Sequence, residues 1–537
     1  MSEYNQATLT LLDCPVEILL KIFGHLDVYE LVRARQICNY TQQAIDSSLE
    51  FLYSIDLKYF HAIPVTVPGS ADTDVQGLRQ SLRQRESAWQ NAQYSSNALD
   101  PVPCPLVMYR WSSGVLGFPV AFLGRQVGQT KRILFLQPQP ADGHSSAPNL
   151  RQWSCQVDHP FPHFNFSPAQ DLMVYLAEAP WGANHAFDVC FRSLSEDNVH
   201  PEAVSPVLKA IDKDIDLELF NLFVQKSSIF GDYYGVLFRN VIRTNGAADF
   251  LQIWNWKSKD AFQCIEAFDL ACDTMDFSFL TNEKILVANA RELSLYSLVQ
   301  SSNSLKITAK FSLPPLRSPF EYKYFNFTPI PFHAHAHNQM ISFSMNISGG
   351  GLATDPCFTL FVERNALLEL ESTYTSRYGK ATEDSPSLPW SSWGPNHTRS
   401  FVERSRDPCK HSVSGFRSVS LAGDRMSERE KRPLCIRDFN PHRVADFKAG
   451  NGSRLNQRLI EGEPTSSNMF LEPLGSGLPY LETITEEKFV ATDMNVEANR
   501  VTLLMFETGR TFTMSQSGQG GPVKYENLQR FEVLDFQ

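Results

Sequence analysis

Hydrophobic and polar positions near the start of the chain follow the period of an α-helix. When residues 16–26 are placed on a helical wheel at about 100° per residue, their large apolar side chains fall within one arc of about 200°. These side chains belong to Val16, Ile18, Leu19, Leu20, Ile22, Phe23 and Leu26. A helix needs an apolar stripe of only about 100° to pack on its own domain. We therefore expect part of this face to be covered, either by the rest of the chain or by a partner protein.

Two further short helices are expected after the first. Asp27 stands at an N-cap position with Glu30 three residues later, which is the pattern of a capping box at the start of a helix. This second helix should continue towards Cys38, and a third should cover residues 40–47. Three helices of this size bury too little apolar surface to be stable comfortably on their own.

The order of residues in this segment resembles the F-box family. The matching stretch contains Pro15, Val16, Glu17, Ile18 and Leu19, then Ile22, Phe23, Leu26, Asp27, Leu31, Ile37 and Cys38. The sequence departs from the family pattern at Cys14, where Leu is usual, and at Thr41, where many members carry Trp. An unrelated amphipathic helical hairpin is the alternative interpretation.

The resemblance implies a partner for the N-terminal helices. It implies that residues 1–60 are a three-helix F-box domain that docks onto the Skp adaptor, and through it onto the cullin, of a Skp–cullin–F-box ubiquitin ligase. In the family, the apolar positions of the motif divide between the domain core and the adaptor interface. Here those positions are occupied by Pro15, Val16, Ile18, Leu19, Ile22, Phe23, Leu26, Leu31, Ile37 and Cys38. The helical wheel does not separate the two sets.

Residues 61–110 are expected to form a spacer of a different character. A helix is predicted in its middle. Its apolar side should carry Leu78, Leu82 and Trp89, with Arg79, Arg83 and Arg85 elsewhere. A local basic run of this kind is typical of a solvated helix face rather than of a nucleic-acid contact. Several prolines follow, and they end the helix and favour extended chain. We interpret the segment as a strut between the F-box and the rest of the chain.

The remaining residues, 111–537, are repetitive. The phrase Phe-Asn-Phe-Ser/Thr-Pro occurs at 164–168 and at 325–329, and a looser copy lies at 276–279. Short apolar runs, several of them alternating with polar residues, predict strands with one buried face. These runs lie at 122–138, 171–177, 187–194, 250–257, 284–290, 292–299, 339–345, 357–363, 433–439 and 501–507. Their repeat of about 40 to 75 residues overlaps the ~40–45 residues of a WD-type propeller blade.

The predicted fold class is an α+β multidomain protein, in which a small three-helix F-box precedes a large all-β body. We predict that this body is a degenerate, WD-like β-propeller of about six or seven blades. A pair of β-sandwiches or another all-β arrangement is the alternative. The strings at 388–399 and 478–480, together with the spacer, resemble those of large fungal F-box proteins. The polar stretches 371–387 and 441–468 are predicted to be loops or insertions.

Composition narrows the classes of protein that remain. The 537 residues are 42% hydrophobic and carry a net charge of −11, which fits a folded protein and disfavours a generally basic nucleic-acid binder. No run approaches the ~18 apolar residues of a membrane span, and the start of the chain lacks the pattern of a secretory signal. The ten cysteines are scattered without a CxxC pair, which is typical of reduced thiols inside the cell. We expect no nucleic-acid or membrane partner, and a cytoplasmic or nuclear location.

The sequence contains few patterns with a chemical meaning. His333, His335 and His337 alternate, so on a strand they would share one face; a zinc site would need further ligands that are not close in sequence. Ser348–Gly351 lacks the Gly-Lys-Ser/Thr of a phosphate-binding loop, so a loop between strands is expected. No nucleophile elbow or HExxH motif is present. We therefore expect no metal, no cofactor and no catalytic residues.

The function that these patterns predict is that of a substrate receptor in a ubiquitin ligase, with an unknown protein target on the β body. One alternative is a scaffold that binds the adaptor without taking part in ubiquitin transfer. Another is a hydrolase with its carboxylates in a propeller funnel, which the sequence alone does not test.

Overall fold

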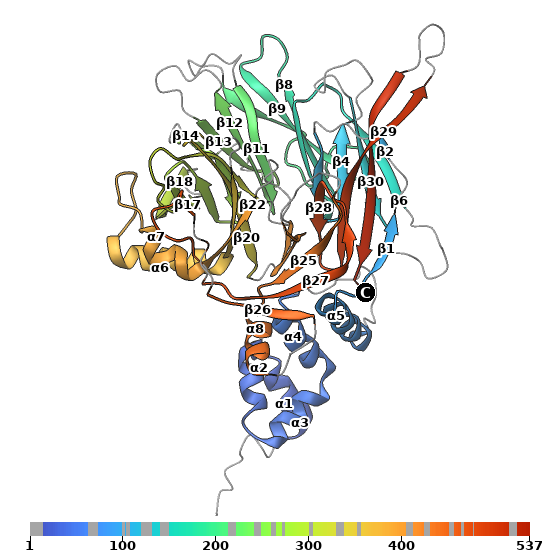
Figure 1. Cartoon of the computed structure of the whole chain (residues 1–537), viewed down its shortest axis with the longest axis vertical. Coiled ribbons are helices and arrows are strands. Elements are labelled where there is room, and N and C mark those ends of the chain that lie inside the picture. Colours follow the sequence, from blue (N-terminus) through green and yellow to red (C-terminus); the bar gives the residue numbers. More distant parts are fainter. Residues whose placement is uncertain are drawn as a thin grey trace, which may run out of the picture.

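A computed structural model of the chain shows a ring of β-sheets with a group of helices attached to one side (Figure 1). The structure describes residues 14–62, 74–98, 102–103, 108–119, 131–139, 150–212, 222–240, 249–258, 265–270, 274–299, 304–328, 338–351, 356–403, 412–423, 430–450, 456–462, 465, 467–475, 477–514 and 523–536.

The N-terminal helices form a small helical domain. They are α1 (Val16–Phe23), α2 (Val28–Arg35), α3 (Asn39–Ser47) and α4 (Leu49–Phe60). The predicted capping box is confirmed, because Glu30 N donates to Asp27 Oδ1 at 2.8 Å and Asp27 N donates to Glu30 Oε2 at 2.9 Å. The first helix ends at Phe23 rather than at 26, since Gly24 follows and α2 needs its N-cap at Asp27. The sequence interpretation did not identify α4 as a separate helix.

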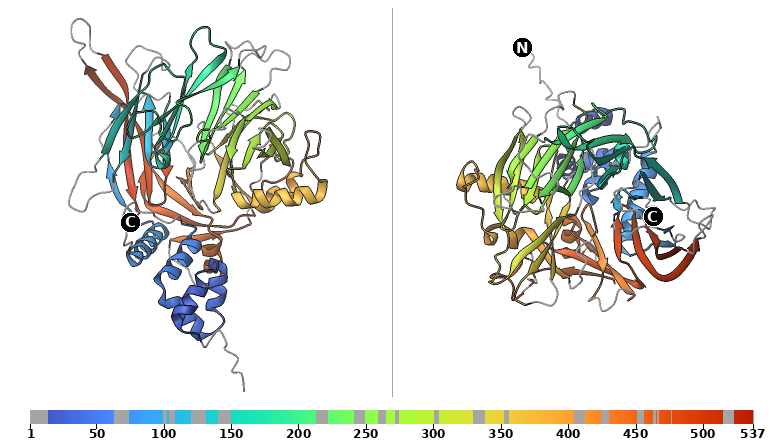
Figure 2. Two further views of the ribbon diagram at one scale, coloured as in Figure 1. Left: turned by 180° about the vertical axis from the view of Figure 1, so that it is seen from behind. Right: turned by 90° about the horizontal axis from the view of Figure 1, so that it is seen from above.

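The β-strands of the described residues form seven antiparallel sheets, arranged around an axis as the blades of a propeller (Figure 2). The predicted β-propeller is therefore confirmed, with seven blades. Six blades each come from one stretch of the chain. The first blade consists of β3 (Arg110–Ser112), β4 (Val115–Pro119), β5 (Arg132–Pro138) and β6 (Leu150–Gln156), and the second of β7 (His163–Ser167), β8 (Leu172–Glu178), β9 (His185–Ser193) and β10 (Val207–Asp212). The third consists of β11 (Leu222–Phe230), β12 (Tyr233–Asn240), β13 (Asp249–Asn255) and β14 (Ile265–Leu270), and the fourth of β15 (Asp276–Phe279), β16 (Lys284–Ala288), β17 (Glu292–Val299) and β18 (Ser304–Ser312). The fifth consists of β19 (Glu321–Phe327), β20 (Met340–Ser348), β21 (Cys357–Glu363) and β22 (Thr398–Glu403), and the sixth of β23 (Ser412–Ser414), β24 (Arg417–Leu421), β25 (Arg432–Asp438), β26 (Gln457–Ile460) and β27 (Tyr480–Phe489).

The seventh blade joins the two ends of the chain. Its strands are β28 (Asp493–Val496), β29 (Arg500–Met514) and β30 (Val523–Asp535), with β1 (Ser95–Ala98) and β2 (Val102–Pro103) paired to β30. Residues 61–110 are therefore more than the expected spacer, because their last part contributes β1 and β2 to a blade. The first part contains the predicted helix, α5 (Val75–Gln90). Pairing β1 with β30 places a strand from near the start of the chain in the same blade as the last strands, and this closes the ring.

Two stretches that were predicted as loops contain helices. α6 (Arg364–Tyr378) runs into the first stretch, and α8 (Pro441–Lys448) begins the second. The outward residues of α6 are Ser, Thr and Glu, which made the sequence read as a polar loop, while its buried side chains pack on the propeller. At α8, Asn440 Oδ1 accepts a hydrogen bond from His442 N at 3.0 Å, so the Asn-Pro pair is a helix start.

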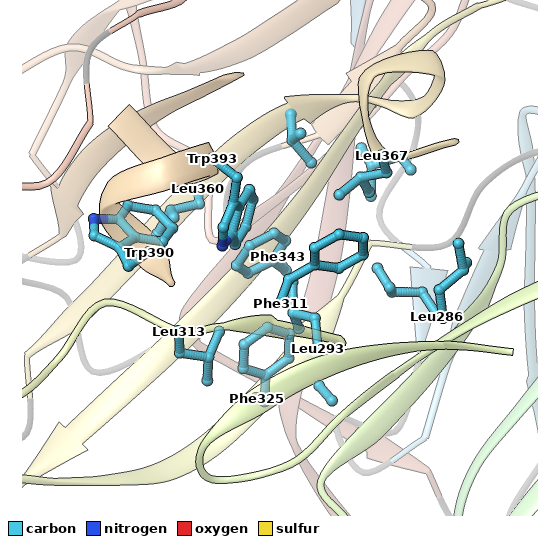
Figure 3. Packing of buried hydrophobic residues seen from close by; sticks show 14 of the residues in the cluster. Leu286, Leu293, Phe311, Leu313, Phe325, Phe343, Leu360, Leu367, Trp390 and Trp393 are labelled. Carbon is cyan, nitrogen blue, oxygen red and sulfur yellow. The ribbon is translucent and has the colours of Figure 1, made fainter. Parts of the chain in front are cut away.

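The largest buried cluster lies where α6 and α7 (Trp390–His397) pack against the fourth and fifth blades (Figure 3). Trp390 and Trp393 cross edge to face with ring centroids 4.9 Å apart. Trp393 also donates from Nε1 to the carbonyl oxygen of Ser312 at 3.0 Å, which ties α7 to β18. The insertion between β21 and β22 is thus part of the propeller core.

The two proline-containing strings noted in the sequence meet in space. Gly477 N donates to the carbonyl oxygen of Pro395 at 2.8 Å, and the Arg399 guanidinium lies over the Tyr480 ring. A Cβ atom at Gly475 would lie only 2.5 Å from Cα of Pro395. Only glycine allows the two backbones to approach this closely.

Replacing Gly475 by Ala should therefore lower the free energy of unfolding by about 1–3 kcal/mol, because the added methyl group overlaps with backbone that cannot move away. Thermal unfolding would measure the loss. Gly24→Ala is a control, since a Cβ there would lie 3.4 Å from its nearest neighbours and needs little adjustment. Equal unfolding midpoints for Gly475→Ala and the unmodified protein would contradict this packing.

Candidate functional site

The structure divides nine of the ten motif residues of the N-terminal helices into a core set and a surface set, and the tenth, Cys38, is the N-cap of α3. Leu19, Phe23 and Leu31 are buried, with at most 3% of their surface exposed, and they form the core of the helical domain with residues of α2 and α3. Val16 and Leu26 are partly buried and pack against this core. These five side chains hold α1 to α4 together.

The surface set consists of Pro15, Ile18, Ile22 and Ile37, which we call the apolar face. Ile18 is 45% exposed, Ile22 39% and Ile37 71%. Ile18 and Ile22 stand four residues apart, so they lie on the same side of α1. Pro15 at the N-cap of α1 is also exposed. Elements of the propeller in the described part of the chain leave these side chains accessible, which argues against the alternative that the chain covers them itself.

The two departures from the F-box pattern have structural roles. Thr41 stands where Trp is common and is buried; its hydroxyl donates to the carbonyl oxygen of Ala34 at 2.8 Å, which fixes α3 to the end of α2. Cys38, the last motif residue, is the half-buried N-cap of α3, and its N–H donates to the Thr41 hydroxyl at 3.3 Å. Cys14 is partly buried against the domain core, as an apolar residue would be.

Three further exposed large side chains of the helical domain were missed by the sequence interpretation. They are Tyr29, Tyr40 and Leu49. Tyr40 additionally donates from its hydroxyl to the carbonyl oxygen of Cys14 at 3.1 Å, so its ring is held beside the start of α1. The sequence offered one signal for these residues, since each is a large apolar or aromatic side chain at a position of a short helix where a polar residue is expected. All three lie outside the F-box pattern.

A buried carboxylate joins the helical domain to α5. Asp56 on α4 accepts hydrogen bonds from Arg79 Nε at 2.7 Å and from Arg83 Nε and Nη2 at 2.6 and 2.8 Å. Asp56 is only 7% exposed, so the charges are partly shielded from water and hold α4 and α5 firmly.

The end of α4 is fastened to α8 of the propeller. Asn440 Nδ2 donates to the carbonyl oxygen of Tyr59 at 2.8 Å, and the Tyr59 hydroxyl donates to the Asp446 carboxylate. His61 packs its ring on Phe416 and His442, with centroids 4.4 and 5.3 Å apart. The last turn of the helical domain is therefore anchored on the propeller.

α5 is fastened to the seventh blade. Trp89 stacks on Phe536 with ring centroids 3.7 Å apart and an interplanar angle of 3°, and it donates from Nε1 to the carbonyl oxygen of Ala498 at 2.9 Å. Arg417 lies 5.0 Å from the Trp89 ring centroid and forms an ion pair with Glu86 of α5. Together with the contacts of α4, these contacts attach the helical domain and α5 to the propeller at several points; α4, α5 and α8 are labelled in Figure 1.

The contact between α4 and α8 should weaken in acid. Burial, and then the charge of Lys58, lower the pKa of His442 below its ordinary value of 6.5. As the pH falls through about 6.5, the unfolded chain therefore takes up a proton that the folded protein disfavours, and the folded state loses stability. We expect His442→Phe to lose less thermal stability than the unmodified protein between pH 7 and about 5. His25→Phe, at an exposed position after α1, should keep the original dependence of thermal stability on pH. If thermal stability changed with pH equally in His442→Phe and in the unmodified protein, this expectation would be contradicted.

Buried polar groups in the propeller connect blades. Lys226 of β11 donates to Asp276 of β15 at 2.6 Å and to the carbonyl oxygen of Phe327 of β19 at 3.0 Å. Burial raises the pKa of Asp276, and the positive charge of Lys226 opposes that rise. The contacts of Lys226 thus link three neighbouring blades, and we interpret the Lys226–Asp276 ion pair as structural.

The remaining candidates for chemistry give no site. His333, His335 and His337 lie outside the described residues. Ser348–Gly351 lies at the end of β20 and in the loop after it, where Gly349, Gly350 and Gly351 all have positive φ. Within the described ranges, no group of three His, Cys, Asp or Glu side chains is arranged to hold a metal ion. No helix in that same part of the chain has the length and apolar character needed to cross a membrane.

Comparison with known proteins identifies the helical domain. An F-box-like family model matches residues 11–57. A search of curated proteins found none that matches this chain. Three solved structures are similar at low identity: the WD40 domain of SCAP from fission yeast (9% identity, TM-score 0.30, 82% of each chain), the C-terminal WD40 domain of Sif2 (10%, 0.29, 82% of this chain and 96% of that one), and the tricorn protease (10%, 0.30, 77% of this chain and 36% of that one). The chain spans about a third of the length of the tricorn protease. Residues 11–57 are thus an F-box-like domain, and it is attached to a seven-bladed β-propeller.

Proposed function

We propose that this protein is a substrate receptor of a Skp–cullin–F-box ubiquitin ligase. Its F-box-like domain binds a Skp-type adaptor through the apolar face, and its propeller binds a protein target. The observation that carries the proposal is the exposure of Ile18, Ile22 and Ile37 on a domain whose core is otherwise complete. Apolar side chains that are exposed in the free protein gain free energy when a partner removes them from water.

The proposed contribution to ubiquitin transfer is positional. The protein supplies no catalytic side chain; it holds a target near the ubiquitin-charged enzyme and raises the effective concentration of target lysines. The rigid strut supports this role, because contacts such as the Asp56–Arg83 ion pair and the Trp89–Phe536 stack keep the F-box-like domain in one position relative to the propeller. We place the protein in the cytoplasm or the nucleus, where such ligases act.

Co-purification tests the proposal. The full chain is expressed with the Skp-type adaptor and the cullin, and the purified assembly is assayed for ubiquitin transfer to proteins held by the propeller. A complex of all three proteins with transfer activity is expected. A protein that binds the adaptor but excludes the cullin would instead be a scaffold, and a protein that binds no adaptor would refute the receptor function.

A further inference from the structure

A groove lies between the start of α4 and one face of α5. Both helices lie on the same side of the propeller (Figure 1). Its volume is about 400 Å³, within the range of ligand-binding clefts. Its wall on α4 is Leu49, and its wall on α5 is formed by Gln76, Arg79, Gln80, Arg83, Gln84 and Ser87. Of these residues, Arg79 and Arg83 also bind Asp56 in the contact between α4 and α5.

The α5 residues of the groove form one continuous stripe. Their spacing of three and four residues places them on one side of the helix over about three turns. Three of them are glutamines, whose amides both donate and accept hydrogen bonds. Such amides match the alternating N–H and C=O groups of an extended peptide backbone. The stripe therefore suits a peptide that lies along α5.

The electrostatics of the groove favour an acidic ligand. Arg79 and Arg83 share a single carboxylate, Asp56, so the three groups together carry one excess positive charge. Asp56 binds Arg83 through Nε and Nη2, and the planar guanidinium therefore directs its other N–H groups away from Asp56. The Arg83 side chain is 55% exposed, so those groups are accessible to a ligand.

The apolar wall adds a second requirement. Leu49 is 42% exposed at the start of α4 and faces the polar stripe across the groove. A ligand that contacts both walls combines carboxylates with an apolar side chain. A nucleic acid fits less well, because its affinity comes from neutralising many phosphates and the groove offers one excess charge.

We propose that this groove binds an acidic peptide segment of a partner protein, with its carboxylates at Arg83 and an apolar side chain against Leu49. None of the residues that line the groove belongs to the apolar face, so the site is distinct in its residues from the proposed adaptor interface. It adds a second docking point next to the F-box-like domain.

Fluorescence anisotropy with the full-length protein tests this site. The probe is a fluorescein-labelled Glu-Glu-Leu-Glu-Glu peptide at low ionic strength, where charge attraction is least screened. The variant Gln80→Glu places a negative charge in the groove without touching the Asp56 ion pairs, and it should weaken binding about tenfold. The matched control Ser81→Glu adds the same charge at an exposed position of α5 outside the groove, and it should change the affinity less than about twofold.

A second pair of measurements tests the apolar wall. Leu49→Ala should weaken binding of the leucine-containing peptide but leave binding of Glu-Glu-Ser-Glu-Glu unchanged, since Leu49 has no apolar partner in the second peptide. The site is refuted if the leucine-containing peptide fails to bind at millimolar concentration, or if Gln80→Glu and Ser81→Glu bind it equally. Equal binding of a six-nucleotide oligo-dT would also overturn the peptide assignment. Adaptor binding, measured on the same variants, should be retained.

Discussion

Replacement of Ile22 by Asp should weaken binding of the Skp-type adaptor more than a hundredfold and leave the protein folded. Ile22 lies on the apolar face with 39% of its surface exposed, so in the free protein the new carboxylate remains in water. In the complex, the same carboxylate would be buried without a partner and the apolar contact would be lost. A loss of about 3 kcal/mol is typical of a central interface residue and corresponds to more than a hundredfold in Kd. Calorimetric titration with purified adaptor measures it.

Two further variants separate a lost interface from a lost fold. Leu19→Ala removes a fully buried side chain of α1 and should cost about 2–5 kcal/mol of domain stability, which thermal unfolding would detect. Leu471→Asp changes an apolar residue of the propeller that is 56% exposed, and it should leave adaptor binding unchanged. Adaptor binding by Ile22→Asp at the original affinity would show that the apolar face is not the adaptor interface.

Replacement of Trp89 by Ala should detach α5 from the seventh blade. The variant loses the stack on Phe536, the hydrogen bond to Ala498 and the ring beneath Arg417. Removing a buried Trp of this kind costs about 3–5 kcal/mol. Thermal unfolding should therefore begin at a lower temperature. Adaptor binding should persist, because the core of the F-box-like domain consists of α1 to α4.

The loss of rigidity can be measured directly. Spin labels at Lys21 on α1 and Glu178 at the end of β8, both exposed, report the distance between the F-box-like domain and the propeller. In Trp89→Ala the distance distribution should broaden, and ubiquitin transfer should fall more than adaptor binding does. Trp181→Ala is a matched control, since Trp181 is 99% exposed and supports no contact in the strut. An unchanged distribution in Trp89→Ala would refute the role of this stack.

Much of the helical domain was predictable because its information is local. The 3.6-residue period of α1, the capping box of α2 and the F-box pattern all lie within residues 15–38. The division of the motif between core and surface was not predictable in the same way. Leu19 and Ile22 lie in one apolar arc of α1, and only the positions of α2 and α3 bury the first and expose the second.

The strands of the propeller were also predictable one by one. The runs that became β8, β13 and β17 carry apolar residues in the pattern of buried strands. The closure of the ring was not, since β1 and β30 come from opposite ends of the chain and no short-range pattern links them. The contacts of Trp89 were unpredictable for the same reason, because its partners Ala498 and Phe536 lie near the other end of the chain.

The sequence by itself determined that this protein has an F-box-like start and a repetitive all-β body, because helical period, capping and strand alternation depend on neighbouring residues. Only the tertiary structure decided which apolar residues remain for a partner, how firmly the two parts are joined, and where a groove forms between α4 and α5. Those features depend on burial and on pairings such as Asp56 with Arg83 or Trp89 with Phe536. Burial and pairing are properties of residues brought together by folding, and the linear order of the chain does not contain them.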